Sequence, residues 1–217
     1  VDAAIAAQMV LTLVEPQSSG IGGGAFLLHY RAGNARRGRV PEVEAYDGRE
    51  VTPAAATPRM FQTQAGDALS FRARIVGGTA TGVPGVLHML ETVHRKHGKL
   101  KWARLFNAAI DLAEKGFEIS PRLESSIVRH KKRLARFPAA RTYFLLPDGK
   151  RVTKANPRGE IVYKARSAGS VLTNAPLAAL FRRIAVDGPD AFYKGEVAAD
   201  MARTVSTTAH RPIAMTT

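Results

Sequence analysis

The segment Asp47-Gly48-Arg49-Glu50 carries the side chain with the most distinctive binding chemistry in this sequence. The guanidinium of an arginine is a planar fork that binds a carboxylate through two parallel hydrogen bonds. Arg49 follows a strand-like segment, and the end of a strand is a rigid place from which to present such a fork. The alternative is a local ion pair of Arg49 with Asp47 or Glu50, which the spacing alone favours. Arg49 is therefore a candidate for binding the carboxylate of a ligand, and the alternative is that it only pairs with a neighbouring acidic residue.

A glycine-rich stretch, EPQSSGIGGGAFLLHY at residues 15–30, is the second candidate. A Walker phosphate loop needs a lysine and then a serine or threonine after its last glycine, whereas Gly24 is followed by Ala25 and Phe26. A dinucleotide-binding loop needs a strand before it and a helix after it, and here that order is reversed. The stretch therefore predicts a tight helix-to-strand connection in which glycines let two backbones approach closely.

The composition excludes several kinds of site. The 217 residues include no cysteine, so disulfides, thiolate metal sites and a cysteine nucleophile are excluded. His88, His94 and His97 lie on or near one predicted helix without clustered carboxylates beside them, so we expect no metal site.

The formal net charge is +14, and much of it lies in residues 130–166. Because no nucleic-acid motif accompanies this basic region, a solvated surface is the favoured interpretation and no nucleic-acid partner is expected.

Hydrophobic patterning places these candidates on a small strand pair at the start of the chain. Residues 2–14 are rich in alanine and leucine and stop before Pro16, which predicts a buried helix. That helix is too short and too interrupted by polar residues to span a membrane, and no later segment is longer. Residues 25–30 and 41–50 predict two strands joined by a polar loop, and hence an antiparallel pair.

The rest of the chain predicts a mostly helical body. From Val83 onward apolar residues recur at helical spacing, with capping signals at Ser120 and Asn174 and a break at Gly188-Pro189. The predicted helices cover residues 86–98, 102–116, 120–137 and, in two pieces, 174–205. This layout lacks the regular strand-helix alternation of a parallel sheet, so the fold class is α+β. We expect residues 1–217 to form a single domain.

Two stretches together resemble the gamma-glutamyltransferase family, namely VDAAIAAQMVLTLVEPQSSGIGGGAFLLHY at residues 1–30 and EAYDGREVTPAAATPRMF at residues 44–61. The resemblance continues through GGTATGVPGVLHMLETVHRKHGKLKWARLFNAAIDLAEKGFEIS at residues 77–120 and GPDAFYKGEVAADM at residues 188–201. It covers residues 1–205, and the glycine stretch and the arginine segment are its most specific parts.

This resemblance implies an N-terminal-nucleophile hydrolase fold, an αββα sandwich shared by two subunits that a precursor forms by cleaving itself. The chain is similar to a truncated large subunit, and the N-terminal threonine of a small subunit, a partner chain, would be the nucleophile. Arg49 corresponds to the arginine that binds the α-carboxylate of a gamma-glutamyl substrate such as glutathione. An amino acid, a peptide or water would accept the gamma-glutamyl group. The resemblance implies no metal or organic cofactor. We expect a periplasmic or secreted location, and a cytoplasmic one stays open.

The chain departs from the family pattern near its C-terminal end. Thr207, Thr208, Thr216 and Thr217 have none of the family's downstream sequence after them, and a threonine inside a chain has no free α-amine to act as base. We therefore expect no catalytic residue in this chain. Two other functions stay open, an acylase-like amidohydrolase on the same scaffold and a basic nucleic-acid-binding module that uses residues 129–166.

Overall fold

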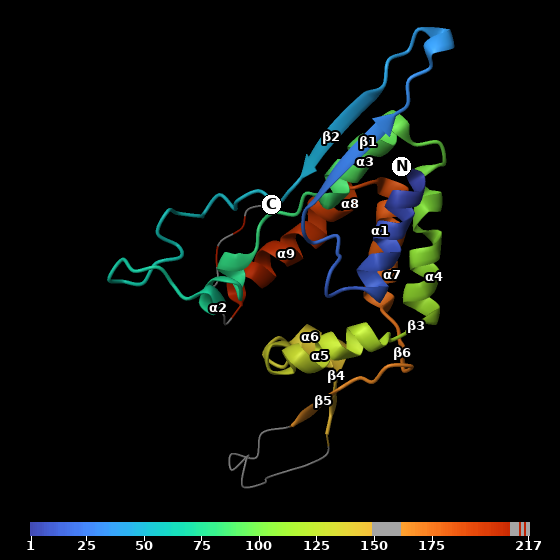
Figure 1. Cartoon of the computed structure of the whole chain (residues 1–217). Helices are drawn as coiled ribbons and strands as arrows, with labels where there is room; N and C mark the ends of the chain where they lie inside the picture. Colours follow the sequence, from blue (N-terminus) through green and yellow to red (C-terminus); the bar gives the residue numbers. More distant parts are fainter. Residues whose placement is uncertain (149–161, 209–212, 214, 216–217) are drawn as a thin grey trace.

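A computed structural model describes residues 1–148, 162–208, 213 and 215 (Figure 1). The α-helices are α1 (Asp2–Val14), α2 (Phe71–Arg74), α3 (Val86–His97), α4 (Asn107–Lys115), α5 (Pro121–Leu134), α6 (Pro138–Phe144), α7 (Ala175–Asp187), α8 (Asp190–Tyr193) and α9 (Gly195–Thr207). Short 3-10 turns are η1 (Ala35–Arg37), η2 (Gly78–Ala80) and η3 (Trp102–Phe106). The strands are β1 (Ala25–Arg31), β2 (Glu42–Gly48), β3 (Phe117–Glu118), β4 (Leu145–Pro147), β5 (Tyr163–Ala165) and β6 (Val171–Leu172).

The centre of the helical body is the group of α1, α4 and α7, which lie side by side (Figure 1). Helix α1 buries Ile5, Met9 and Leu13, which recur every four residues and so lie on one face. Phe106 and Phe181 are fully buried beside them, with their ring centroids 5.9 Å apart. The predicted buried helix at residues 2–14 is confirmed, and its burial fixes the start of the glycine stretch.

The predicted antiparallel pair is confirmed as β1 and β2. Their register runs from Ala25 opposite Gly48 to Arg31 opposite Glu42. Helix α3 packs against one face of this pair (Figure 1). Within the described residues the opposite face of the pair is open, and its side chains are apolar at Phe26 and Leu28. The pair is therefore covered by a helix on one face and exposed on the other.

The remaining differences from the sequence prediction are short elements. Two further strand pairs, β3 with β6 and β4 with β5, have only two or three residues a strand, and none was predicted. The segment after Gly188 forms two helices, α8 and α9, where one was expected. The chain turns sharply between them because Gly195 has a φ of +66°, which ends one helix and starts the next.

The fold class is confirmed as α+β with a mostly helical body. In the part of the chain that the structure describes, no helix is long and apolar enough to cross a membrane. The C-terminal residues Thr216 and Thr217 lie outside the described part.

Helix α5 provides a direct test of the capping signals in the sequence. The Ser120 hydroxyl accepts a hydrogen bond of 3.1 Å from the backbone N–H of Leu123, and Pro121 occupies the first helical position. We expect Ser120→Ala to lower the free energy of unfolding by about 1 kcal/mol, since the N–H loses its partner. The exposed mid-helix Ser125 is the matched control, and Ser125→Ala should change stability by less than about 0.5 kcal/mol. Urea unfolding of the two variants would contradict the capping role if they are equally stable.

Candidate functional site

Arg49 lies immediately after the last residue of β2, in an exposed position. Its backbone N–H donates a hydrogen bond of 2.8 Å to Oδ1 of Asp47, so the carboxylate that could have paired with the guanidinium instead holds the backbone. Among the residues that the structure describes, the guanidinium forms no hydrogen bond or ion pair. The local ion pair that the spacing favours is therefore absent, and the fork of Arg49 is available to a ligand.

The glycine stretch packs directly against the backbone of Arg49. A Cβ atom added to Gly24 would lie 2.8 Å from the Cα of Arg49 and 2.9 Å from the backbone nitrogen of Glu50, closer than real Cβ atoms approach. A Cβ atom added to Gly22 would have no other atom within 4 Å. Gly24 therefore lies against the backbone of Arg49 at a distance that leaves no room for a side chain. The expected close approach of backbones is confirmed there.

The same stretch also caps helix α3. The carbonyl of Gly23 accepts hydrogen bonds from the backbone N–H groups of Gly85, at 3.0 Å, and Val86, at 3.2 Å. A phosphate loop would instead aim its own N–H groups at an anion, which the helix N-terminus would also attract. Here a carbonyl already satisfies those helix donors. The stretch is thus a structural connection, as the order of its flanking elements predicts.

A third segment completes the frame around Arg49. Val51 and Val83 form an antiparallel bridge with hydrogen bonds of 3.1 and 2.8 Å. Gly85 lies so close to the carbonyls of Gly48 and Arg49 that a side chain there would collide with backbone. Three stretches that are separate in the sequence, around residues 24, 49 and 85, therefore meet at one point.

Arg49 lines two adjacent cavities. The first has a volume of about 280 Å³ and is lined by Asp47, Gly48, Arg49, Val51, Val83, Pro84, Gly85, His88, Met89 and Tyr193. The second, of about 520 Å³, lies toward Arg74 and Phe61. Burial raises the pKa of the Tyr193 phenol above its ordinary value. One arginine between two small cavities suits a ligand with a carboxylate and a short side chain.

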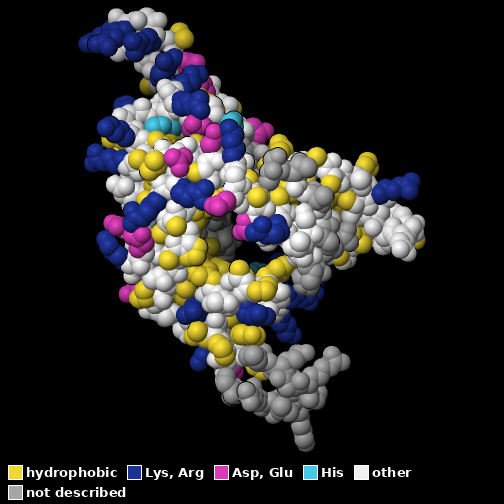
Figure 2. All heavy atoms as spheres, turned by 180° about the vertical axis from the view of Figure 1, so that it is seen from behind, with side chains coloured by type: hydrophobic (Ala, Val, Ile, Leu, Met, Phe, Trp, Pro, Cys, Tyr) yellow, Lys and Arg dark blue, Asp and Glu magenta, His cyan; other side chains and the backbone are white. Residues whose placement is uncertain are grey.

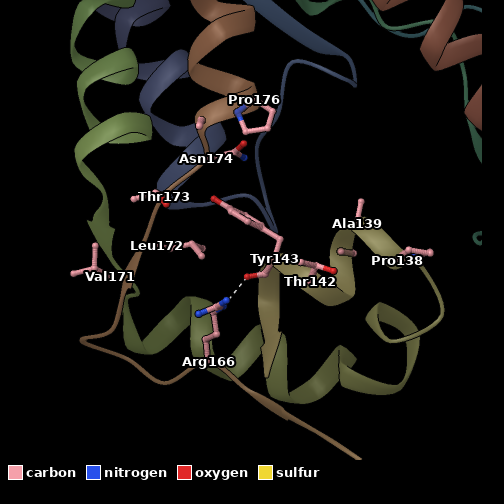
Figure 3. Close-up of a pocket in the computed structure, with 12 residues that line it drawn as sticks. Pro138, Ala139, Thr142, Tyr143, Arg166, Val171, Leu172, Thr173, Asn174 and Pro176 are labelled. Carbon is pink, nitrogen blue, oxygen red and sulfur yellow. Dashed lines mark hydrogen bonds between the residues drawn. The ribbon is translucent and has the colours of Figure 1, made fainter. Parts of the chain in front are cut away.

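A cavity larger than the two beside Arg49 lies elsewhere, between α6 and the start of α7 (Figure 3). Its volume is about 940 Å³, and the Tyr143 ring crosses it with its hydroxyl toward Asn174. Arg166 is held there through a 2.8 Å hydrogen bond from its Nε to the Tyr143 carbonyl. No residue that the sequence singled out for chemistry lines this cavity apart from the helix cap Asn174, so size alone does not identify the site.

The histidines of α3 have three different environments. His88 lines the cavity next to Arg49. His94 donates a hydrogen bond of 2.9 Å to the carbonyl of Leu100. The premise that no carboxylate lies beside these histidines does not hold for His97, since its Nε2 lies 3.3 Å from Oε2 of Glu44. His29 and Glu44 had no signal in the sequence because they approach His97 only after the strands pair.

In the described part of the chain, the basic region contributes Tyr143 and Arg166 to the cavity between α6 and α7. Lysines and arginines are spread over the visible face with acidic side chains among them (Figure 2). Residues 149–161 of the basic region lie outside the described part. Thr207 is within α9, where its hydroxyl donates to the carbonyl of Arg203 at 2.8 Å.

Comparisons with known proteins identify the family of the chain. A family model described as gamma-glutamyltranspeptidase matches residues 1–210. The glutathione hydrolase proenzyme of Bacillus subtilis (strain 168) is 38% identical over 205 residues, which are 94% of this chain and 31% of the relative. The chain thus spans about a third of the length of the curated relatives it matches.

Solved structures give the same result. The crystal structure of Helicobacter pylori gamma-glutamyltranspeptidase superposes with a TM-score of 0.78 at 29% identity, covering 94% of this chain and 52% of that one. Cephalosporin acylase from Bacillus halodurans superposes with a TM-score of 0.68 at 25% identity, covering 94% and 33%. The fold is that of the N-terminal-nucleophile hydrolases, of which this chain forms one part. The chain belongs to the gamma-glutamyltranspeptidase family and corresponds to its N-terminal, large-subunit portion.

Proposed function

We propose that this chain supplies the carboxylate-binding wall of an enzyme that transfers or hydrolyses the gamma-glutamyl group of glutathione-like amides. The observation that carries the proposal is the unpaired guanidinium of Arg49, held at the end of β2 beside two cavities. A free α-carboxylate distinguishes a gamma-glutamyl group from most other acyl groups. A bidentate arginine is the side chain best suited to bind it.

The reaction that fits this wall uses a nucleophile from a second chain. The hydroxyl of an N-terminal threonine gives its proton to its own α-amine and attacks the γ-carbonyl carbon. Backbone N–H groups stabilise the tetrahedral oxyanion. The C–N bond then breaks, the leaving amine takes the proton, and a gamma-glutamyl ester of the threonine remains. Water or an acceptor amine attacks that ester and restores the hydroxyl, so no metal or organic cofactor takes part.

The open face of the strand pair supports a partner layer. Phe26, Leu28 and Tyr30 project from β1 and are 66%, 74% and 62% exposed. Such a contiguous apolar strip is unusual on the solvent-exposed surface of a protein and marks an interface. We propose that the second sheet of an αββα sandwich, contributed by the rest of the enzyme, covers this strip. On this proposal residues 1–217 are part of one domain, and the site is incomplete without the other chain.

The test of the proposed function uses the complete polypeptide that contains this chain. Mass spectrometry of the purified protein should find a second fragment that begins with threonine. The protein should release the amine from gamma-glutamyl amides and act far less on acyl amides that lack the glutamyl group. A preference for non-glutamyl acyl groups would instead support the acylase alternative. Binding of DNA with a steep salt dependence, without amidase activity, would support the nucleic-acid alternative.

A periplasmic or secreted location stays a prediction. The absence of cysteine is compatible with an oxidising compartment but does not require one. Cell fractionation with antibodies against the chain checks it, and a cytosolic signal would contradict it.

A further inference from the structure

A second cluster of chemically active side chains lies where the strand pair meets the C-terminal end of α3. His29 and Glu44 face each other across the register of β1 and β2, and His97 is the last residue of α3. One ligand atom from each of the three lies within 4.8 Å of the other two. Glu44 precedes Arg49 by five residues along extended chain, roughly 16 Å at the rise of a strand. The cluster is therefore separate from the Arg49 site.

The two histidines are packed against each other and are largely shielded from solvent. Their ring centroids are 3.8 Å apart with 22° between the planes. The side chains of His97 and Glu44 are 13% and 16% exposed. The Nδ1 atom of His29 is buried and has no hydrogen-bond partner. A buried imidazole nitrogen without a partner is costly unless something binds it.

The Glu44 carboxylate makes its polar contacts through one oxygen, Oε2. Its Oε2 accepts hydrogen bonds of 2.5 Å from Lys96 Nζ and 2.5 Å from the Tyr46 hydroxyl. Its other oxygen, Oε1, has no hydrogen-bond partner among the described residues. One oxygen of the Glu44 carboxylate is therefore free to contact a ligand.

We propose that His29, Glu44 and His97 form a binding site for a divalent transition-metal ion of the zinc type. Two imidazoles and one carboxylate are a ligand set that zinc accepts, with water in the fourth position. The two imidazole rings must tilt from their stacked arrangement so that one nitrogen of each ring points to the metal. The exposed Lys96 moves away from Glu44, and Tyr46 keeps its hydrogen bond to the ligating carboxylate, a typical supporting contact. The bound ion would tie β1, β2 and α3 together, and its role is structural.

The experiment is a calorimetric titration of zinc chloride into the complete polypeptide that contains this chain, prepared without a tag and free of metal. We expect one zinc ion per chain at this cluster. His29→Gln, Glu44→Gln and His97→Gln should each weaken binding by at least about 100-fold, because each removes a direct ligand. The exposed His130 on α5 is the matched control, and His130→Gln should leave zinc affinity unchanged. Zinc should also raise the midpoint of thermal unfolding of the wild type but not of Glu44→Gln.

Lys96 gives a variant that should gain affinity, which keeps the proposal testable even if a ligand variant folds poorly. Its ammonium competes with the metal for Glu44, and its side chain is 59% exposed, so Lys96→Met disturbs no core. We expect zinc to bind about two- to fivefold more tightly to this variant, the worth of an exposed ion pair. The proposal is overturned if the wild type binds no zinc, if the three ligand variants bind it as well as the wild type does, or if Lys96→Met weakens binding.

Discussion

Arg49→Ala is expected to lower kcat/KM for a gamma-glutamyl donor about 30- to 900-fold, the equivalent of about 2 to 4 kcal/mol of lost transition-state binding. The reason is that the guanidinium has no partner among the described residues of the chain, so its binding capacity is free for the α-carboxylate of the substrate. Steady-state kinetics of the complete, processed enzyme measures this effect. The loss should appear mainly in KM if the contact is made equally in the ground state and the transition state.

Two further variants separate the effect of the bidentate hydrogen bonds of Arg49 from the effect of its positive charge. Arg49→Lys keeps one positive charge but cannot form two parallel hydrogen bonds, so its kcat/KM should lie between those of wild type and Arg49→Ala. Arg129 on the exposed side of α5 is the control for loss of one positive charge, and Arg129→Ala should have wild-type kinetics. Equal losses in Arg49→Ala and Arg129→Ala would show that net charge, and not a specific contact, is what matters.

Gly24→Ala is the second variant with a large expected effect. The new methyl group would meet the Cα of Arg49 at 2.8 Å and the backbone nitrogen of Glu50 at 2.9 Å, and both atoms belong to the backbone directly after β2. We expect a loss of about 1 to 3 kcal/mol in the free energy of unfolding, as for other overpacked positions. We also expect about a 100-fold loss of kcat/KM, since a displacement of about 1 Å of a positioning group has that cost.

Gly22→Ala is the matched control for this prediction. It is two residues away in the same loop and has nothing within 4 Å of its added methyl group. Chemical unfolding and kinetics should therefore give wild-type values. If both glycine variants are equally impaired, the loop needs glycine for flexibility and not for contact with Arg49.

The strand pair could be predicted from local patterns, whereas its register comes from the structure. Residues 25–30 and 41–50 have strand composition and are joined by a polar loop, so antiparallel pairing follows. Once Ala25 is opposite Gly48, Gly24 must flank Arg49. The caps at Ser120 and Asn174 were also found from sequence, and each accepts the expected backbone hydrogen bond. These features depend on residues that are close together or on a regular period.

The features that could not be predicted depend on contacts between distant residues. Strands β3 and β6 have two residues each and pair across more than fifty residues of chain, too short for any alternation to appear. The approach of His97 to Glu44 depends on how α3 packs on the strand pair. The absence of a local ion pair at Arg49 depends on Asp47 bonding the backbone instead, a choice between two local geometries that spacing does not decide.

The central claim is that Arg49 recognises the α-carboxylate of a gamma-glutamyl group. The most direct test measures kcat/KM of the wild type and Arg49→Ala for two donors, a gamma-glutamyl anilide and the same anilide with its α-carboxylate converted to a carboxamide. Wild type should prefer the carboxylate donor by about 30- to 900-fold, and Arg49→Ala should use both donors almost equally. If Arg49→Ala keeps the preference of the wild type for the carboxylate donor, another group binds that carboxylate and the claim is contradicted.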